Sequence, residues 1–198
     1  MKCKSDLRGA IIARRNALSP AEIAVLSRAA CDHLLSLPEF VAARVVMFFI
    51  TFGSEVDTLP LIRSAMDLEK RALAPRAVRS TKLLIPCEIT DLDRDLAPGA
   101  YGIRAPRAGC RMAKLDEIDL ILVPAAVWAE DGYRVGYGAG YYDRFLRFVP
   151  RAHRIGLGFE VQVVPQVPHD EHDLPVDMLV TERGVRRFSH RRAKGDQE

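Results

Sequence analysis

Residues 44–51 read Arg-Val-Val-Met-Phe-Phe-Ile-Thr, and this run does most to decide the fold. Every position from Val45 to Ile50 is apolar, without the alternating polar side chains of a strand that has one exposed face. The run therefore predicts a strand buried on both faces of a parallel sheet, and Gly53 ends it. A second run of the same kind, Ile118 to Pro124, predicts a second buried strand.

Helical segments are expected on both sides of the first strand. Residues 4–17 combine good helix formers with apolar residues at Leu7, Ile11 and Ile12. A second helix begins after Ser19-Pro20-Ala21-Glu22, a capping box with proline at the first helical position. It is expected to run to about Leu37, where Pro38 stops it, with one apolar face made of Ile23, Leu26, Ala30, Leu34 and Leu37.

The remaining elements follow the same alternation of strand and helix. Helices are expected at about 59–70 and 141–148, and strands at 71–74, 82–89, 154–159 and 178–181, while 91–111 is a polar stretch rich in Gly and Pro. This order predicts one three-layer αβα domain with a largely parallel central sheet, Rossmann-like in its general plan. Ligands in such sheets bind beyond the carboxyl ends of the strands, so the loops after Thr51 and Pro124 are the first candidates.

The composition excludes several classes of protein. The 198 residues are 48% hydrophobic and 28% charged, which suits one globular core and excludes disordered and collagen-like chains. No apolar run approaches the roughly 20 residues of a membrane span, and no apolar segment of a secretory leader precedes Arg14. The four cysteines have no paired spacing and receive no role. We expect a cytoplasmic protein that does not bind membranes.

The positive charge is concentrated at the C-terminus. Six of the 29 basic residues lie between Arg183 and Lys194. The rest of the chain has 23 basic and 26 acidic residues, so its net charge is −3. We therefore expect a domain over 1–185 and a basic, solvated tail over 186–198. The alternative is a tail that contacts RNA or DNA. The solvated tail is the preferred interpretation, so no nucleic-acid partner is expected.

The segment with most chemical information is 131–144, which reads Asp-Gly-Tyr-Arg-Val-Gly-Tyr-Gly-Ala-Gly-Tyr-Tyr-Asp-Arg. Four of the 13 glycines fall within nine residues directly before a helix, as in loops whose backbone cradles a phosphate. A Walker P-loop is excluded because the Lys-Ser/Thr pair is missing. A dinucleotide fingerprint lacks its third glycine, which would be Tyr141, and only Glu160 favours it. A simple tight turn would explain one such glycine, not three.

At this point the segment resembles a known family. Val123 to Arg144 is similar to the signature of the 5-formyltetrahydrofolate cyclo-ligases, a Val-Pro strand end followed by R-L-G-x-G-x-G-Y-Y-D-R. Further blocks in the family's order are Lys4-x-x-Leu7-Arg8, Gly53-Ser54-Glu55-Val56-Asp57-Thr58, Tyr101-Gly102-Ile103, Val176-Asp177 and Thr181-Glu182. They cover the chain to about Val185. The resemblance also implies a fold of the NagB/RpiA/CoA-transferase type.

The resemblance implies an activity and its cofactors. Members of the family use ATP and Mg²⁺ to convert 5-formyltetrahydrofolate into 5,10-methenyltetrahydrofolate, with release of ADP and phosphate. Phosphorylation of the formyl oxygen would create an electrophile that N10 attacks, and such a transfer needs positioning and charge neutralisation. The partner expected is therefore the folate, with or without a polyglutamate tail, and the protein is expected to be a monomer.

The resemblance also implies site residues. Lys4, Arg134 and Tyr142 would be catalytic, and Asp143 and Asp177 would hold Mg²⁺. ATP would contact Lys4, Arg8, Arg134, Val135, Gly136, Tyr137, Gly138, Ala139, Gly140, Tyr141 and Tyr142. The folate would contact Ile50, Glu55, Tyr137, Gly138, Ala139, Gly140 and Tyr141.

The match has departures from the family pattern. Val135 stands where Leu is usual. Alanine also stands at four positions where the family varies or commonly has another residue, namely Ala105, Ala125, Ala129 and Ala139. None of these changes removes a proposed phosphate or metal ligand. The tract His169 to Asp173 could bind a metal, but it lies between Pro168 and Pro175 without a helical frame, so a polar loop is preferred. Trp128 is expected in the core or in a pocket wall.

Overall fold

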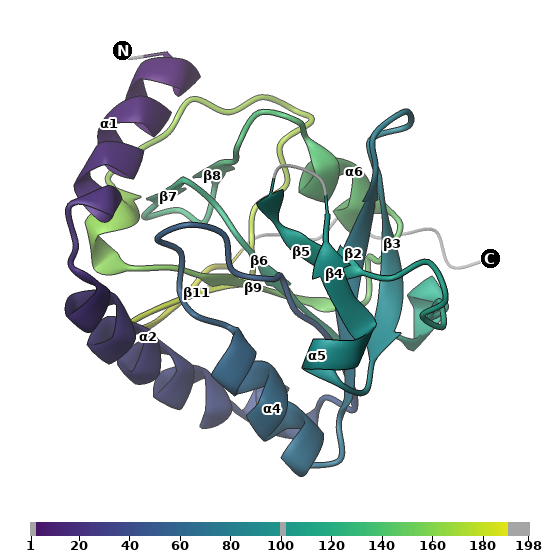
Figure 1. The fold of residues 1–198 in the computed structure, drawn as a ribbon. Coiled ribbons are helices and arrows are strands. Elements are labelled where there is room, and N and C mark those ends of the chain that lie inside the picture. The colour runs from purple at the N-terminus through teal and green to yellow at the C-terminus, as the bar shows by residue number, and fades with distance from the viewer. Residues whose placement is uncertain (1–2, 100–101, 190–198) are drawn as a thin grey trace.

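The computed structural model describes residues 3–99 and 102–189 and contains a seven-stranded central sheet (Figure 1). The strand order is β12-β11-β9-β6-β1-β2-β3. The five strands from β11 to β2 are parallel, and β3 and β12 are antiparallel at the two edges. Their bounds are β1 Val45–Met47, β2 Arg71–Val78, β3 Leu83–Ile89, β6 Leu120–Val123, β9 His153–Leu157, β11 Met178–Thr181 and β12 Gly184–Arg187.

The helices cover both faces of this sheet, as predicted. One face packs against α2, α3 and α4, and the other against α6. The capping box at Ser19 is present, since its hydroxyl accepts from the Glu22 N–H. The helices are α1 Lys4–Asn16, α2 Pro20–Leu35, α3 Pro38–Ala42, α4 Leu59–Asp67, α5 Leu92–Asp95 and α6 Tyr141–Arg147, with 3₁₀ turns η2 Leu115–Glu117 and η3 Glu160–Gln162.

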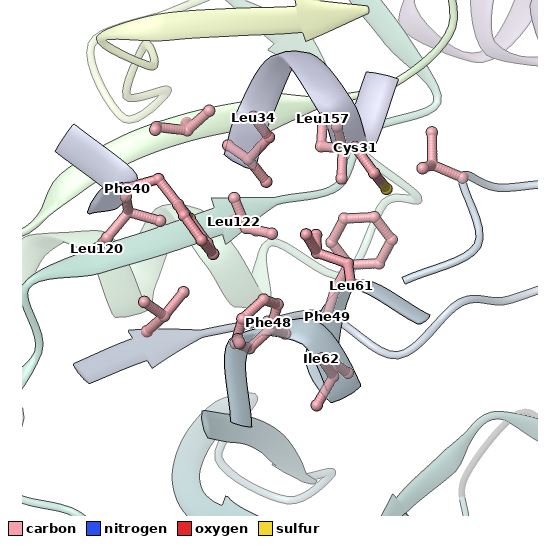
Figure 2. Close-up of a cluster of buried hydrophobic side chains, with 14 of the residues drawn as sticks. Cys31, Leu34, Phe40, Phe48, Phe49, Leu61, Ile62, Leu120, Leu122 and Leu157 are labelled. Carbon is pink, nitrogen blue, oxygen red and sulfur yellow. The ribbon is translucent and has the colours of Figure 1, made fainter. Parts of the chain in front are cut away.

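Adjacent residues of each buried strand contribute to two different cores. Val46 and Leu122 belong to the cluster under α2 to α4, whereas Met47 and Val123 belong to the cluster under α6. Figure 2 shows the first cluster, in which side chains from the helices and from the strands point toward one another. Burial on both faces is what the unbroken apolar runs predicted. Burial also raises the pKa of Cys31 in this cluster to about 12, as expected of an unreactive core thiol.

Several boundaries differ from the prediction, among them the strand that begins at Arg71, which continues to Val78. The strand β1 pairs only over Val45–Met47, although Phe48 still donates its N–H to the Leu73 carbonyl at 2.8 Å and the chain stays buried to Ile50. Pro38 does more than end α2, because it is also the first residue of α3, a position where its missing N–H costs nothing.

Several short strands were not expected from the sequence. The polar stretch 91–111 contains α5 and a two-stranded sheet of β4 Leu96–Pro98 and β5 Arg104–Pro106. A three-stranded sheet is formed by β7 Val127–Ala129, β8 Arg134–Val135 and β10 Val163–Val164. The helix α1 packs Ile11 against this small sheet, and so joins the body of the protein away from the main helical layer.

The C-terminal strand continues past the expected domain boundary at 185. Arg186 in β12 forms an ion pair with Glu160 at 2.5 Å, and Arg187 forms one with Glu39. Two of the six basic residues between Arg183 and Lys194 therefore hold the edge strand against the body. The rest of the expected tail, from 190 to 198, lies outside the described residues. Over the described ranges, the chain contains no helix long and apolar enough to span a membrane.

Candidate active site

A cleft of about 1200 Å³ opens at the carboxyl ends of the central strands. Its floor includes Phe49 and Ile50, which follow β1, and Pro124, which follows β6. Its walls come from the β2–β3 hairpin, the β4–β5 sheet and the glycine-rich loop between β8 and α6. Both loops that the sequence selected for ligand binding therefore contribute to one cavity.

The glycine-rich loop needs glycine at two positions. Gly138 has φ +104° and Gly140 has φ +66°, values that side chains other than glycine rarely adopt. Gly140 is the N-cap of α6, and the Arg144 guanidinium donates to the carbonyls of Ala139 and Gly140 at 2.9 Å each. The loop is thereby held as a tight curve whose residues from Gly136 to Asp143 all line the cleft.

Arg134 and Asp143 form a buried ion pair at the base of this loop. The Arg134 side chain is 4% exposed, and its guanidinium donates to Asp143 Oδ1 at 2.6 Å and to the Leu174 carbonyl. Burial lowers the pKa of Arg134, while the charges of Asp143 and Asp173 oppose that shift. Arg134 thus fixes the Asp143 carboxylate at the cleft wall.

Tyr142 brings an unpartnered hydroxyl to the cleft. The residue lines the cavity, yet its oxygen is buried and has no hydrogen-bond partner among the described residues. Burial raises the pKa of Tyr142 strongly, the Glu55 charge raises it further, and Arg134 opposes both. A buried hydroxyl is costly unless something bonds it, so this group is poised for a ligand.

Glu55 and Tyr137 form a second polar pair in the same cleft. Glu55 is 6% exposed, accepts a hydrogen bond from the Phe52 N–H at 2.9 Å, and also accepts one from the Tyr137 hydroxyl. Burial raises the pKa of Glu55, and those two bonds together with the Arg15 charge oppose the rise. Arg15 in α1 donates to the Tyr137 hydroxyl at 2.8 Å, a contact that the sequence did not suggest.

The first residues of α1 reach the opposite side of the glycine-rich loop. Lys4 Nζ lies 2.6 Å from Asp173 Oδ2 and 3.7 Å from Asp170 Oδ2. Arg8 lies against Gly138, where an added Cβ would sit 3.5 Å from its guanidinium. Neither cation is among the residues that line the cleft, but Arg8 lies beside the loop that does.

The chain is similar to known proteins over most of its length. The model of the 5-formyltetrahydrofolate cyclo-ligase family matches residues 1–182. The chain belongs to this family. It is 28% identical over 178 residues to the 5-formyltetrahydrofolate cyclo-ligase of Escherichia coli (strain K12), covering 85% of this chain and 94% of that protein. It is 27% identical over 189 residues to the Mus musculus enzyme of the same name, covering 90% and 93%.

Two solved structures also resemble this cyclo-ligase family member. The NMR structure of Aquifex aeolicus 5,10-methenyltetrahydrofolate synthetase is 34% identical in sequence and superposes with a TM-score of 0.83. The match covers 98% of this chain and 96% of that one. A 5,10-methenyltetrahydrofolate synthetase from Mycoplasma pneumoniae is 22% identical with a TM-score of 0.74, over 90% and 98%. The second likeness supports the fold alone.

Within this family member, the structure separates Asp177 from the cleft. Asp177 lies at the amino end of β11, where its Oδ2 accepts from the Arg154 N–H at 2.8 Å and its own N–H donates to the Arg154 carbonyl. Asp177 is not among the described residues that line the cleft, and its expected pairing with Asp143 at a metal remains a prediction. Asp173 is also outside the cleft lining, but the N–H of the next residue, Leu174, donates to Asp143 Oδ1 at 3.4 Å.

One other expected contact also differs in the cyclo-ligase site. Val135 is 3% exposed and packs with Ile11 and Val127 in the core of the small sheet, so its side chain does not line the cleft. The substrate residues expected from the resemblance do line it, namely Ile50, Glu55, Tyr137, Gly138, Ala139, Gly140 and Tyr141.

A divalent cation implied by the cyclo-ligase family can be tested against these side chains. The part of the chain that the structure describes holds no group of three or more His, Cys, Asp or Glu able to bind a metal. Mg²⁺ needs less than that, because it is commonly held by one or two carboxylates, water and the phosphates of a substrate. Asp143 fits, since both of its hydrogen bonds fall on Oδ1 and none from a described residue falls on Oδ2.

The histidine tract of this family member has other partners. His169 stacks on Tyr133 with ring centroids 3.7 Å apart, whereas His172 lies against Arg147 at 3.3 Å. The two imidazoles thus contact different neighbours. Within the tract, only Asp170 and Asp173 contact a residue of the candidate site, through Lys4.

Proposed function

We propose that the protein catalyses the ATP- and Mg²⁺-dependent cyclisation of 5-formyltetrahydrofolate to 5,10-methenyltetrahydrofolate. ATP would phosphorylate the formyl oxygen, N10 would attack the formyl carbon, and the C–O bond would then break to release phosphate and leave ADP as the other product. The formyl oxygen is a poor leaving group, so the phosphoryl group is what allows ring closure. Support comes from family membership over residues 1–182 and from a cleft large enough for two ligands.

The observation that carries the proposal is the Tyr142 hydroxyl. It is buried, it has no partner in the described part of the chain, and it lies in the electrostatic reach of both Glu55 and Arg134. These two residues belong to the folate half and the phosphate half of the proposed site. The Tyr142 hydroxyl, placed between them, is suited to donate a hydrogen bond to the formyl oxygen, whose negative charge changes during phosphoryl transfer.

The phosphate half is proposed around the glycine-rich loop. Its curved backbone can approach an anion closely because Gly138 and Gly140 carry no side chain. Lys4 and Arg8 would supply positive charge from α1, and a phosphate would compete with Asp173 for the Lys4 ammonium. Arg134 is proposed as the residue that orients Asp143, since both of its bonds are already made.

The folate half is proposed around Glu55. A pterin ring presents adjacent N–H donors, and a buried carboxylate is a suitable acceptor for them. Ile50 and Tyr141 would supply apolar walls, because both line the same cleft as this carboxylate. Tyr137 would then influence pterin binding through Glu55, because its hydroxyl donates a hydrogen bond to that carboxylate.

The metal half of the proposal is revised from the sequence. Asp143 and Asp173 are proposed as the carboxylates for Mg²⁺, in place of Asp143 and Asp177. The reason is that Asp173 directly precedes Leu174, whose backbone N–H donates a hydrogen bond to Asp143. Bound Mg²⁺ would neutralise phosphate charge during the transfer.

The test is an activity assay with purified protein. Incubation with 5-formyltetrahydrofolate, ATP and Mg²⁺ is expected to produce the absorbance of the methenyl product. Omission of ATP, or addition of a chelator, should abolish the signal. A folded protein that gives no absorbance change with saturating folate would contradict the proposal.

A further inference from the structure

Arg15 is a buried cation that the proposed reaction does not use directly. It lies in the last turn of α1, it is 3% exposed, and its guanidinium makes two hydrogen bonds to other parts of the chain. Nε donates to Ser54 Oγ at 3.0 Å, and NH1 donates to the Tyr137 hydroxyl at 2.8 Å. A buried guanidinium needs such partners, so its place is closely determined.

The contact with Tyr137 connects Arg15 to the folate half of the site. The Tyr137 hydroxyl has one proton, which it donates to Glu55 Oε1, while its oxygen accepts from Arg15. Arg15 therefore fixes the direction in which the hydroxyl points, and the guanidinium also lies 5.9 Å from the Tyr137 ring centroid. The Arg15 charge favours the ionised form of Glu55 against the effect of burial.

The same helix carries the cations of the phosphate half. Lys4, Arg8 and Arg15 follow one another at intervals of four and seven residues, which places them along one face of α1. The eleven residue steps from Lys4 to Arg15 correspond to roughly 16 Å of helix. The first half of α1 thus places Arg8 beside Gly138, and its last turn places Arg15 on Tyr137 of the same loop, whose hydroxyl donates to Glu55.

We infer that Arg15 is a positioning residue for folate recognition, acting through the Tyr137 hydroxyl on the Glu55 carboxylate. The inference deepens the proposed function and rests on it, because Glu55 is taken as the acceptor for the pterin. It predicts that Arg15 governs affinity for the folate and leaves affinity for ATP unchanged, although Lys4 and Arg8 lie on the same helix.

The test is a double-mutant cycle on ligand affinity. The variants are Arg15→Met, Tyr137→Phe and the double variant, with Arg14→Met as the matched control. Arg14 is the neighbouring arginine on the exposed side of α1, so its replacement removes the same charge from the same turn. Calorimetry gives Kd for 5-formyltetrahydrofolate and, separately, Kd for ATP with Mg²⁺.

Each single variant is expected to weaken folate binding by about tenfold or more, the order of one hydrogen bond to a charged group. The double variant should be no weaker than the weaker single one, because both changes break one chain of contacts. ATP affinity should stay at the wild-type value in Arg15→Met, and Arg14→Met should bind both ligands normally. Loss of ATP affinity in parallel with folate affinity would instead indicate general disturbance of α1 and would overturn the inference.

A pH profile provides a second readout. The charged and titratable groups around Glu55 are Arg15, Tyr137 and Tyr142. Without Arg15, protonation of Glu55 should begin at a higher pH, so folate binding should be lost at a higher pH on acidification. An unchanged profile, or additive effects in the cycle, would overturn the inference.

The wild-type protein separates this inference from the function on which it rests. If it binds no folate, the proposed function and the inference fail together. If it binds folate and Arg15→Met binds equally well, the inference alone fails.

Discussion

At the scale of single residues, the hydroxyl of Tyr142 gives the sharpest prediction. Tyr142→Phe removes a donor that has no described protein partner, so the stability of the fold should be unchanged or slightly higher. The value of kcat should fall by about 100-fold, the order found when one donor to a reacting oxygen is lost. Steady-state kinetics and thermal unfolding measure the two effects. Normal turnover in this variant would remove Tyr142 from the chemistry.

Two aspartates test the revised metal assignment. Asp173→Asn should raise the Mg²⁺ concentration needed for half-maximal activity, because the carboxylate beside Asp143 is lost. Asp177→Asn should leave the Mg²⁺ requirement unchanged and lower stability instead, since Asp177 bonds the Arg154 backbone at the amino end of β9. Mg²⁺ titrations of activity on both variants decide between them. The reverse pattern would restore Asp177 to the metal site.

Residue roles were predictable where a motif carried them and not where distant segments meet. Glu55 and the glycine-rich loop could be selected because their neighbours in sequence form recognisable blocks. Arg15 looks like any cation on a helix, and its burial depends on Tyr137, which is 122 residues away. Asp173 lies in a polar loop, and its contact with Lys4 joins residues 169 positions apart in the sequence.

At the scale of elements, β9 depends on glycine where it passes under Trp128. A Cβ on Gly156 would lie 2.5 Å from the fully buried Trp128 ring. Gly156→Ala should therefore lower the free energy of unfolding by about 1–3 kcal/mol, as overpacking in a core does.

A matched control is available in α1. Gly9 is exposed and has nothing near its Cβ position, so Gly9→Ala should stabilise the helix by about 1 kcal/mol. Denaturant unfolding of both variants measures the difference. Equal effects of the two substitutions would contradict the packing of Trp128 on β9.

Elements were predictable in proportion to their length and periodicity. The buried strand Met178–Thr181 and the helix that begins at Pro20 appear where the sequence indicates them, because apolar runs and a capping box are strong local signals. The strands β4 and β5 have three residues each and contain prolines, so they carry no periodic pattern. They form because the chain folds back on itself in a wall of the cleft, which is a tertiary effect.

At the scale of the whole molecule, the C-terminal strand is held to the body by charge. The Arg186 hydrogen bond, with a smaller contribution from Thr181, keeps the pKa of Glu160 below its usual value of 4.5. A depressed pKa contributes stability that is complete above the unfolded value and is lost as pH falls through the folded value. Wild-type stability should therefore decline below about pH 4.5, and Glu160→Gln should be less stable at neutral pH with a flatter acid limb.

Unfolding in denaturant at a series of pH values checks this expectation. Glu171→Gln is the control, because the Glu171 side chain is 86% exposed. If the free energy of unfolding had the same pH dependence in wild type and in Glu160→Gln, the ion pair between Arg186 and Glu160 would not be what holds β12. The net charge of +3 says little about such contacts, since individual positions decide them.

The whole architecture brings the glycine-rich loop and Glu55 to one cleft at the carboxyl edge of a parallel sheet, where we propose that the phosphate half and the folate half of the site meet. The central claim is that ATP cleavage and ring closure are one coupled reaction in that cleft. The most direct measurement follows methenyl absorbance and released phosphate together in the same reaction. One phosphate for each methenyl product, with no phosphate released when folate is omitted, is the predicted result. Phosphate release that continues without formation of the methenyl product would contradict the claim.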